Sequence, residues 1–128
     1  MAQSMLITLP SHNDHRGGLS FTENTKLPFD IKGTWWYYNL SDQAFVEATA
    51  YRDADILLIA LFGSFTITTD NGCISKQEIL NSPNQGLYIP AGIWHRLEFM
   101  STTAVLLVLS SKRYEDCKEA SCYQKLKQ

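Results

Sequence analysis

Histidine is scarce in this chain: the 128 residues include three, at positions 12, 15 and 95. A metal site built on imidazole needs two or three such rings close to a carboxylate. His12 and His15 lie in an N-terminal stretch far along the chain from His95. We therefore predict neither a metal site nor another cofactor.

The sequence also lacks an excess of positive charge, an even number of cysteines and a long apolar run. Eleven Lys and Arg against 13 Asp and Glu give a net charge of −2, which argues against a nucleic-acid or anionic-membrane partner. Three cysteines do not suit a disulfide framework. The apolar runs at 56–65 and 104–111 are too short to span a bilayer, and the first ten residues do not have the pattern of a signal peptide. We expect a cytoplasmic protein.

What the sequence does contain is a series of short β-type segments with turns between them. These segments are rich in β-branched and aromatic residues and lie at 4–9, 26–40, 43–51, 54–69, 73–80, 87–99 and 102–110. Residues 10–18 are predicted to form a loop, and Asn71-Gly72 a two-residue hairpin turn. The apolar run after residue 54 is typical of a strand that is buried on both faces.

The C-terminal segment differs from the rest, because residues 111–128 have the character of a helix, with acidic residues early and lysines late. The pattern as a whole predicts one domain over residues 1–128, an all-β barrel or sandwich followed by a short C-terminal helix. An open sheet would expose its edge strands, so we expect closure of the sheet or dimerisation through an edge.

One short motif singles out His95. Gly86, Pro90, Gly92 and His95 follow the order Gly, spacer, Pro-x-Gly-x-x-His, which resembles the second sequence signature of cupin barrels. The Pro-x-Gly turn joins two strands tightly, so the histidine that follows can point into the mouth of the barrel. The first cupin signature, His-x-His followed by a carboxylate and a glycine, is matched only in part at residues 49–63.

Over nearly its whole length, the chain resembles the WxcM-like sugar 3,4-ketoisomerases that act on dTDP-4-keto-6-deoxyglucose. The matching stretches are "RGGLSF", "LPFDIK", "LLIALFGSFTITTDNG", "NSPNQGLYIPAGIWH" and "AVLLVLSSKRY". The resemblance implies a cupin-like double-stranded β-helix, or jelly-roll, barrel that forms a homodimer and binds a nucleotide sugar. It also implies metal-free proton transfer between adjacent sugar carbons.

The polar residues of that family are largely replaced in this chain. The resemblance puts the family's His-x-His pair at Thr49 and Tyr51, with the basic residue after it at Arg52. Three arginine positions of the family fall on Gly33, Val46 and Ser121. Threonine does not titrate near neutral pH, and tyrosine with its ordinary pKa near 10 is a poor base. We therefore expect altered or lost isomerase activity.

Tyr51 and His95 are the predicted catalytic residues. Strand periodicity puts Trp35 and Tyr37 on one face, which we expect to point into the barrel. The predicted ligand-binding residues are Trp35, Tyr37, Thr49, Arg52, Tyr88 and Trp94. Three functions stay open: a barrel that binds a sugar or nucleotide sugar, an active isomerase on a different sugar-like substrate using Tyr51 and His95, and a non-catalytic interaction protein with a filled interior.

Overall fold

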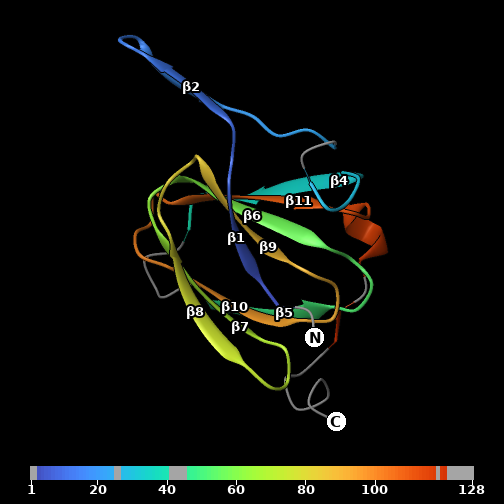
Figure 1. Ribbon diagram of the computed structural model, residues 1–128. Helices are drawn as coiled ribbons and strands as arrows, with labels where there is room; N and C mark the ends of the chain where they lie inside the picture. The colour runs from blue at the N-terminus through green and yellow to red at the C-terminus, as the bar shows by residue number, and fades with distance from the viewer. Residues whose placement is uncertain (1–2, 25–26, 41–45, 118, 121–128) are drawn as a thin grey trace.

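The computed structural model describes residues 3–24, 27–40, 46–117 and 119–120, and most of these lie in two antiparallel β-sheets that form two layers (Figure 1). The first sheet has five strands in the order β1-β9-β6-β11-β4. Its strands are β1 (Met5–Thr8), β9 (Gln85–Ile89), β6 (Ile56–Phe62), β11 (Val105–Ser110) and β4 (Gly33–Tyr37).

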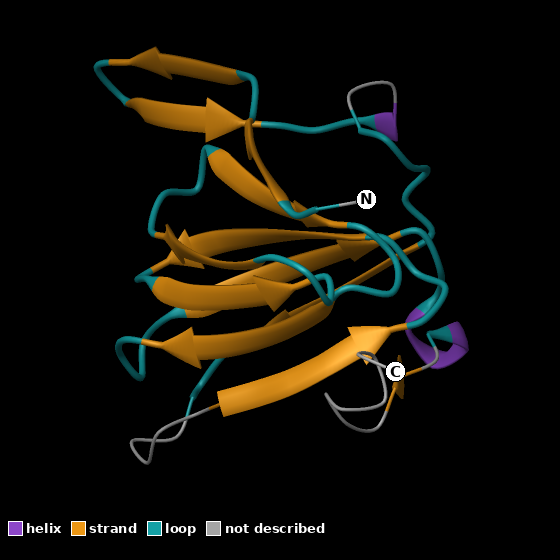
Figure 2. Cartoon of the chain, turned by 60° about the horizontal axis from the view of Figure 1, so that its bottom comes forward, coloured by secondary structure: helices purple, strands orange, loops and turns teal. Residues whose placement is uncertain are grey.

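The second sheet also has five strands, in the order β12-β5-β10-β7-β8. Its strands are β12 (Glu119–Ala120), β5 (Val46–Tyr51), β10 (Trp94–Phe99), β7 (Phe65–Asp70) and β8 (Ser75–Leu80). The remaining strands, β2 (Ser11–Asp14) and β3 (Gly17–Ser20), form a separate hairpin that extends away from both sheets (Figure 2).

The hydrophobic core lies between the two sheets. Alternate residues of each strand point inward, as the two-residue period of a strand requires. Ile56 and Leu58 of β6 pack in one cluster with Phe65 and Ile67 of β7 and Leu97 of β10, all of them almost fully buried. Apolar surface removed from water stabilises a fold by about 25 cal/mol per Å². Because most of the described residues lie in these two antiparallel sheets, the predicted all-β fold class is confirmed.

A second apolar cluster covers the outer face of the first sheet. Leu57 and Ile59 of β6 pack there with Leu109 of β11, Leu9 and Phe29. Residue Phe29 belongs to the segment between the hairpin and β4, which lies over this sheet. Strand β6 thus has apolar residues buried on both faces, as its continuous apolar run predicts.

Two of the predicted turns differ from the structure. The N-terminal stretch predicted as a loop forms the β2–β3 hairpin, in which Asp14 accepts hydrogen bonds from the backbone and side chain of Arg16. The β7–β8 connection is a hairpin, but residues 71–74 all separate its strands. Asn71 Oδ1 accepts hydrogen bonds from the Cys73 and Ile74 backbone N–H groups, and this favours the longer loop over a two-residue turn.

The predicted C-terminal helix is wrong. In the described part of this segment, Tyr114–Asp116 form one 3₁₀ turn, and Cys117 after it is extended at φ −72° and ψ 125°. Strand β12 then pairs with β5, with Glu119 opposite Tyr51, so strand pairing supplies the backbone hydrogen bonds instead of a helix. Residues 121–128, and with them the position of Ser121, lie outside the described residues. No helix in the described ranges is long and apolar enough to cross a membrane.

Candidate functional site

The turn before β10 fixes the position of His95. Gly92 has a φ of +86°, a conformation that glycine adopts at little cost. The Gly92 N–H donates a 2.7 Å hydrogen bond to the Tyr51 carbonyl, and the Ala91 N–H donates a 2.8 Å bond to Asp55 Oδ1. Asp55, which belongs to the segment that matches the first cupin signature in part, therefore anchors the turn.

His95 lies in a row of buried polar side chains across the second sheet. It is paired with Thr49 of β5 on one side and Thr69 of β7 on the other. Residues directly opposite each other in antiparallel strands point to the same face. Thr69 Oγ1 and Ser4 Oγ are 2.8 Å apart, which extends the row by one hydroxyl. Thr49, His95 and Thr69 therefore share one face of the second sheet.

The His95 imidazole is neutral at pH 7. The side chain is 2% exposed, and this burial lowers the pKa of His95 from 6.5 to about 4, with the Ile93 backbone opposing the shift. Within the described residues, its buried Nδ1 has no hydrogen-bond partner. Buried polar groups are nearly always paired, so an unpaired one marks a place for a water or a ligand atom.

Aromatic rings connect His95 to the protein surface. The ring centroids of Tyr51 and His95 are 5.7 Å apart, those of Trp35 and Tyr51 are 6.1 Å apart, and those of Tyr114 and Trp35 are 4.9 Å apart. Tyr51 is 6% exposed and Tyr114 is 65% exposed. We call these four residues the aromatic series. In the described part of the chain, the buried Trp35 Nε1 also has no hydrogen-bond partner.

The structure brings some predicted site residues together and separates others. Trp35 and Tyr37 both pack against the core that contains Tyr51, as the strand period predicts. Tyr88 lies on the outer face of the first sheet, where its ring stacks on Phe29 at 6.0 Å. Trp94 precedes the inward-facing His95 and so points to the opposite face of β10. Arg52 is exposed after the end of β5.

Three polar or aromatic residues of the site were not predicted from the sequence. The alternation of β7 turns the Thr69 side chain inward, but the sequence pattern of this segment indicates only a strand and not a site residue. Ser4 reaches the site through the antiparallel pairing of β1 and β9, a long-range contact. The sequence predicts a helix at Tyr114, so no local signal indicates that its ring contacts Trp35.

The chemistry that this site can perform is limited by its residues. Tyr51 carries a hydroxyl, Thr49 and Thr69 carry hydroxyls that do not titrate near neutral pH, and His95 is neutral. In the described ranges, His, Cys, Asp and Glu side chains form no group of three that could hold a metal ion. The arrangement suits hydrogen bonding and ring contacts to a small polar ligand.

Comparison with known proteins places these observations in a family. The model of the WxcM-like, C-terminal family (FdtA) matches residues 2–127. The TDP-4-oxo-6-deoxy-alpha-D-glucose-3,4-oxoisomerase of Aneurinibacillus thermoaerophilus is 31% identical over 104 residues, which cover 80% of this chain and 75% of the relative.

Solved structures give the same result. The TDP-quinovose 3,4-ketoisomerase WlaRB of Campylobacter jejuni has a TM-score of 0.90 at 29% identity, covering 99% of this chain and 98% of the other. A histidine-to-asparagine mutant of the 3,4-ketoisomerase QdtA from Thermoanaerobacterium thermosaccharolyticum, in complex with TDP-4-keto-6-deoxyglucose, has a TM-score of 0.89 at 27% identity, covering 99% and 93%. The resemblance predicted from the sequence is confirmed, and the chain belongs to the WxcM-like family that includes these sugar 3,4-ketoisomerases.

Proposed function

We propose that this protein binds a sugar or nucleotide sugar and that its ketoisomerase activity is altered or lost. The relatives that it resembles are TDP-sugar 3,4-ketoisomerases, and one of the similar structures holds TDP-4-keto-6-deoxyglucose. The unpaired Trp35 Nε1 and His95 Nδ1 on the aromatic series support a polar ligand in the interior.

The observation that carries the loss of activity is the protonation chemistry of the site. Moving a keto group from C4 to C3 of a sugar requires a base to remove the C3 proton and an acid to protonate C4. General bases work best when their pKa lies near the working pH. The pKa of His95 is about 4, and Thr49 and Tyr51 occupy the positions that the resemblance assigns to the family's histidine pair.

A second candidate function is an isomerase that acts on a different sugar-like substrate. The contact between the rings of Tyr51 and His95, with centroids 5.7 Å apart, favours this candidate. In such an enzyme, the neutral imidazole accepts a proton and the tyrosine hydroxyl donates one. A Tyr51→Phe substitution removes the hydroxyl and would abolish turnover, while leaving the ring and most of the binding contacts in place.

A third candidate is a non-catalytic interaction protein whose interior is filled by its own side chains. The packing of Trp35 and Tyr37 against the core favours this candidate. In this case, the aromatic series serves only to fill the space between the sheets, and no sugar enters it.

We also propose that residues 1–128 act as one cytoplasmic domain, with the two sheets as the walls of a jelly-roll barrel, and that the protein is a homodimer. The β2–β3 hairpin supports the dimer. It extends away from the sheets in both views, with Leu19 59% exposed (Figures 1 and 2). A hairpin of two strands is marginally stable on its own in water, and contact with a second subunit would stabilise it.

Calorimetric titration with dTDP-glucose, a stable analogue of the family substrate, tests the proposed binding. We expect micromolar affinity. A Trp35→Ala substitution should weaken it at least tenfold, because a ring that contacts the ligand is lost. Trp36→Ala is the matched control, since Trp36 is 55% exposed on the other face of β4. No heat at millimolar ligand would contradict the proposal and favour the filled interior.

A further inference from the structure

The loop between β7 and β8 carries an Asn-Gly pair that the proposed ligand site does not use. Residues 71–74 join the two strands; Asn71 is half-buried, and Gly72, Cys73 and Ile74 are exposed. Asparagine occurs at six positions of the sequence, and at Asn71 alone the next residue is glycine. The hydrogen bonds of this loop arrange the groups that a reaction between these two residues needs.

Asparagine is one of the thermolabile residues of proteins. The backbone nitrogen of the next residue can attack its side-chain amide carbon, and this attack is least hindered when the next residue is glycine, which has no Cβ. Gly72 has a φ of +96°. In the described part of the chain, a Cβ atom built there would meet nothing within 4 Å apart from its chain neighbours. The Gly72 nitrogen therefore lies in open surroundings.

Two backbone donors polarise the amide carbonyl of Asn71. Its Oδ1 accepts a 2.9 Å hydrogen bond from the Cys73 N–H and a 2.8 Å bond from the Ile74 N–H. Attack on Cγ would place negative charge on this oxygen. Donors that already point to the place where charge develops stabilise a transition state without further reorganisation. The loop thus forms a small oxyanion hole around the Asn71 side chain.

A carboxylate is hydrogen-bonded to the nitrogen that would attack. The Gly72 N–H donates a 2.7 Å hydrogen bond to Asp70 Oδ1. A backbone nitrogen becomes a nucleophile only as it loses its proton, so a base must receive that proton while the new bond forms. A general base acts from within hydrogen-bond reach of the proton, and Asp70 meets this condition.

We propose that Asn71 is a site of self-catalysed deamidation. The Gly72 nitrogen attacks Asn71 Cγ and gives its proton to Asp70 as the new C–N bond forms. The bond between Cγ and Nδ2 then breaks, and Asp70 returns the proton, so that ammonia leaves. Water from the solvent adds to one of the two carbonyl carbons of the cyclic imide, and the ring opens to aspartate or isoaspartate. No oxidant or reductant is needed, because no atom changes its oxidation state.

The reaction would change both the charge and the length of the loop. Either product adds one negative charge to a chain whose net charge is −2. Isoaspartate also adds one carbon to the backbone between residues 71 and 72. Thr69 lies two residues earlier in β7, and its Oγ1 is 2.8 Å from Ser4 Oγ. The modification would therefore occur next to the row of polar side chains around His95.

Mass spectrometry of the full chain, kept at neutral pH, tests the proposal. Trypsin separates Asn71 from Asn84, because Lys76 lies between them. Asn84 is the internal control, since it is exposed in the turn before β9 but is followed by Gln85. Asn71 should lose ammonia well before Asn84 does, with isoaspartate among the products. Equal rates at the two positions would overturn the proposal.

A comparison of folded and unfolded chain separates the effect of the loop from that of the Asn-Gly pair alone. Asn71 should react faster in the folded protein than in the same chain unfolded in guanidinium chloride, because only the folded loop holds Asp70 and the two N–H donors in place. The reverse order would show that the loop protects the amide, and would overturn the proposal.

Substitution of the proposed base gives an independent test. Asp70→Ser should slow the reaction at Asn71 roughly tenfold or more, since a positioned general base contributes at least that much. Asp14→Ser is the matched control, because Asp14 also accepts a hydrogen bond, of 2.8 Å, from the backbone N–H two residues later.

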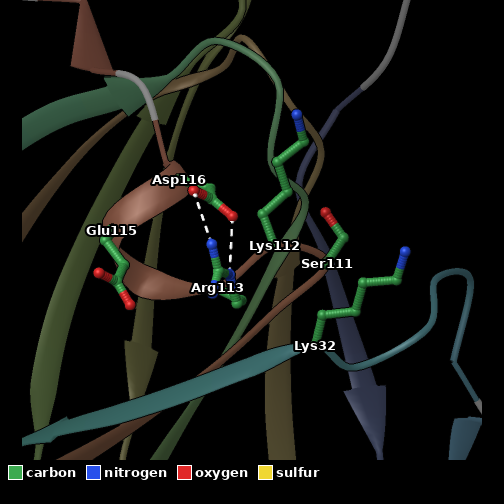
Figure 3. Close-up of a pocket in the computed structure, with 6 residues that line it drawn as sticks. All are labelled: Lys32, Ser111, Lys112, Arg113, Glu115 and Asp116. Carbon is green, nitrogen blue, oxygen red and sulfur yellow. Dashed lines mark hydrogen bonds and ion pairs between the residues drawn. The ribbon is translucent and has the colours of Figure 1, made fainter.

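Asp116→Ser is a second control, which removes an exposed carboxylate that lies 2.9 Å from Arg113 (Figure 3). Both control variants should react at the natural rate. An unchanged rate in Asp70→Ser, or an equal fall in the controls, would overturn the proposal.

Discussion

The buried imidazole of His95 should make the stability of this protein depend on pH in a defined window. The pKa of His95 is about 4 in the folded chain, below the 6.5 of an unfolded chain. Between these values the unfolded state binds more protons than the folded state, so the free energy of unfolding must fall as the pH falls. The stabilisation is complete above pH 6.5 and is lost progressively down to pH 4.

The size of the effect follows from the difference between the two pKa values. Each pKa unit corresponds to about 1.4 kcal/mol. Linkage then gives a loss of about 1 kcal/mol at pH 5.5 and about 3 kcal/mol at pH 4, relative to pH 7.5. Small domains are stable by about 5–15 kcal/mol in total, so this single residue accounts for a measurable part of the acid sensitivity.

Urea unfolding of the natural protein and of His95→Gln, measured from pH 7.5 to pH 4.5, isolates this contribution. Carboxylates that titrate in both proteins, such as Asp14 and Asp116 with their lowered pKa values, cancel in the difference. The two stability curves should converge as the pH falls. NMR of the His95 ring should show no titration above pH 5. Parallel curves, or a ring midpoint near pH 6.5, would refute the burial argument.

Three further predictions concern packing and catalysis. Gly33→Ala should destabilise the fold by about 1–3 kcal/mol in urea unfolding, because the new Cβ meets the Lys112 carbonyl oxygen; an unchanged stability would contradict the close packing. Leu87→Ala should cost about 2–5 kcal/mol, since Leu87 is fully buried, whereas Ile79→Ala, at a side chain that is 62% exposed, should cost under about 0.5 kcal/mol; equal costs would contradict the burial pattern. The double substitution Thr49→His and Tyr51→His should raise the rate of proton exchange at sugar C3 by about two orders of magnitude, measured by NMR, and no increase would contradict the assigned register.

The sequence predicted those parts of the fold that depend on local patterns. The apolar run of β6, the Pro90-Ala91-Gly92 turn and the alternation that turns Trp35 inward all follow from residues close together in the chain. These features depend on the two-residue period of strands and on turn chemistry, which the sequence displays directly.

What the sequence did not predict depends on long-range contacts. The distribution of charges after Ser111 is typical of a helix, but β12 in this segment pairs with β5 instead. No local sequence signal predicts that pairing. Tyrosine is common in binding sites, and Tyr88 is one of the predicted site residues, but its ring stacks on Phe29 on the outer face of the first sheet. The close approach of the Lys112 carbonyl oxygen to Gly33 also joins segments that are far apart in the chain, and no local signal predicts it.

The most direct test of altered or lost isomerase activity is an NMR assay with dTDP-4-keto-6-deoxyglucose in D₂O. A working 3,4-ketoisomerase removes the C3 proton, so deuterium from the solvent enters the sugar even when little product accumulates. We predict that the natural protein binds the sugar but incorporates deuterium at C3 no faster than buffer does, because its buried imidazole is too weak a base. Rapid deuterium incorporation with formation of the 3-keto sugar would contradict the account.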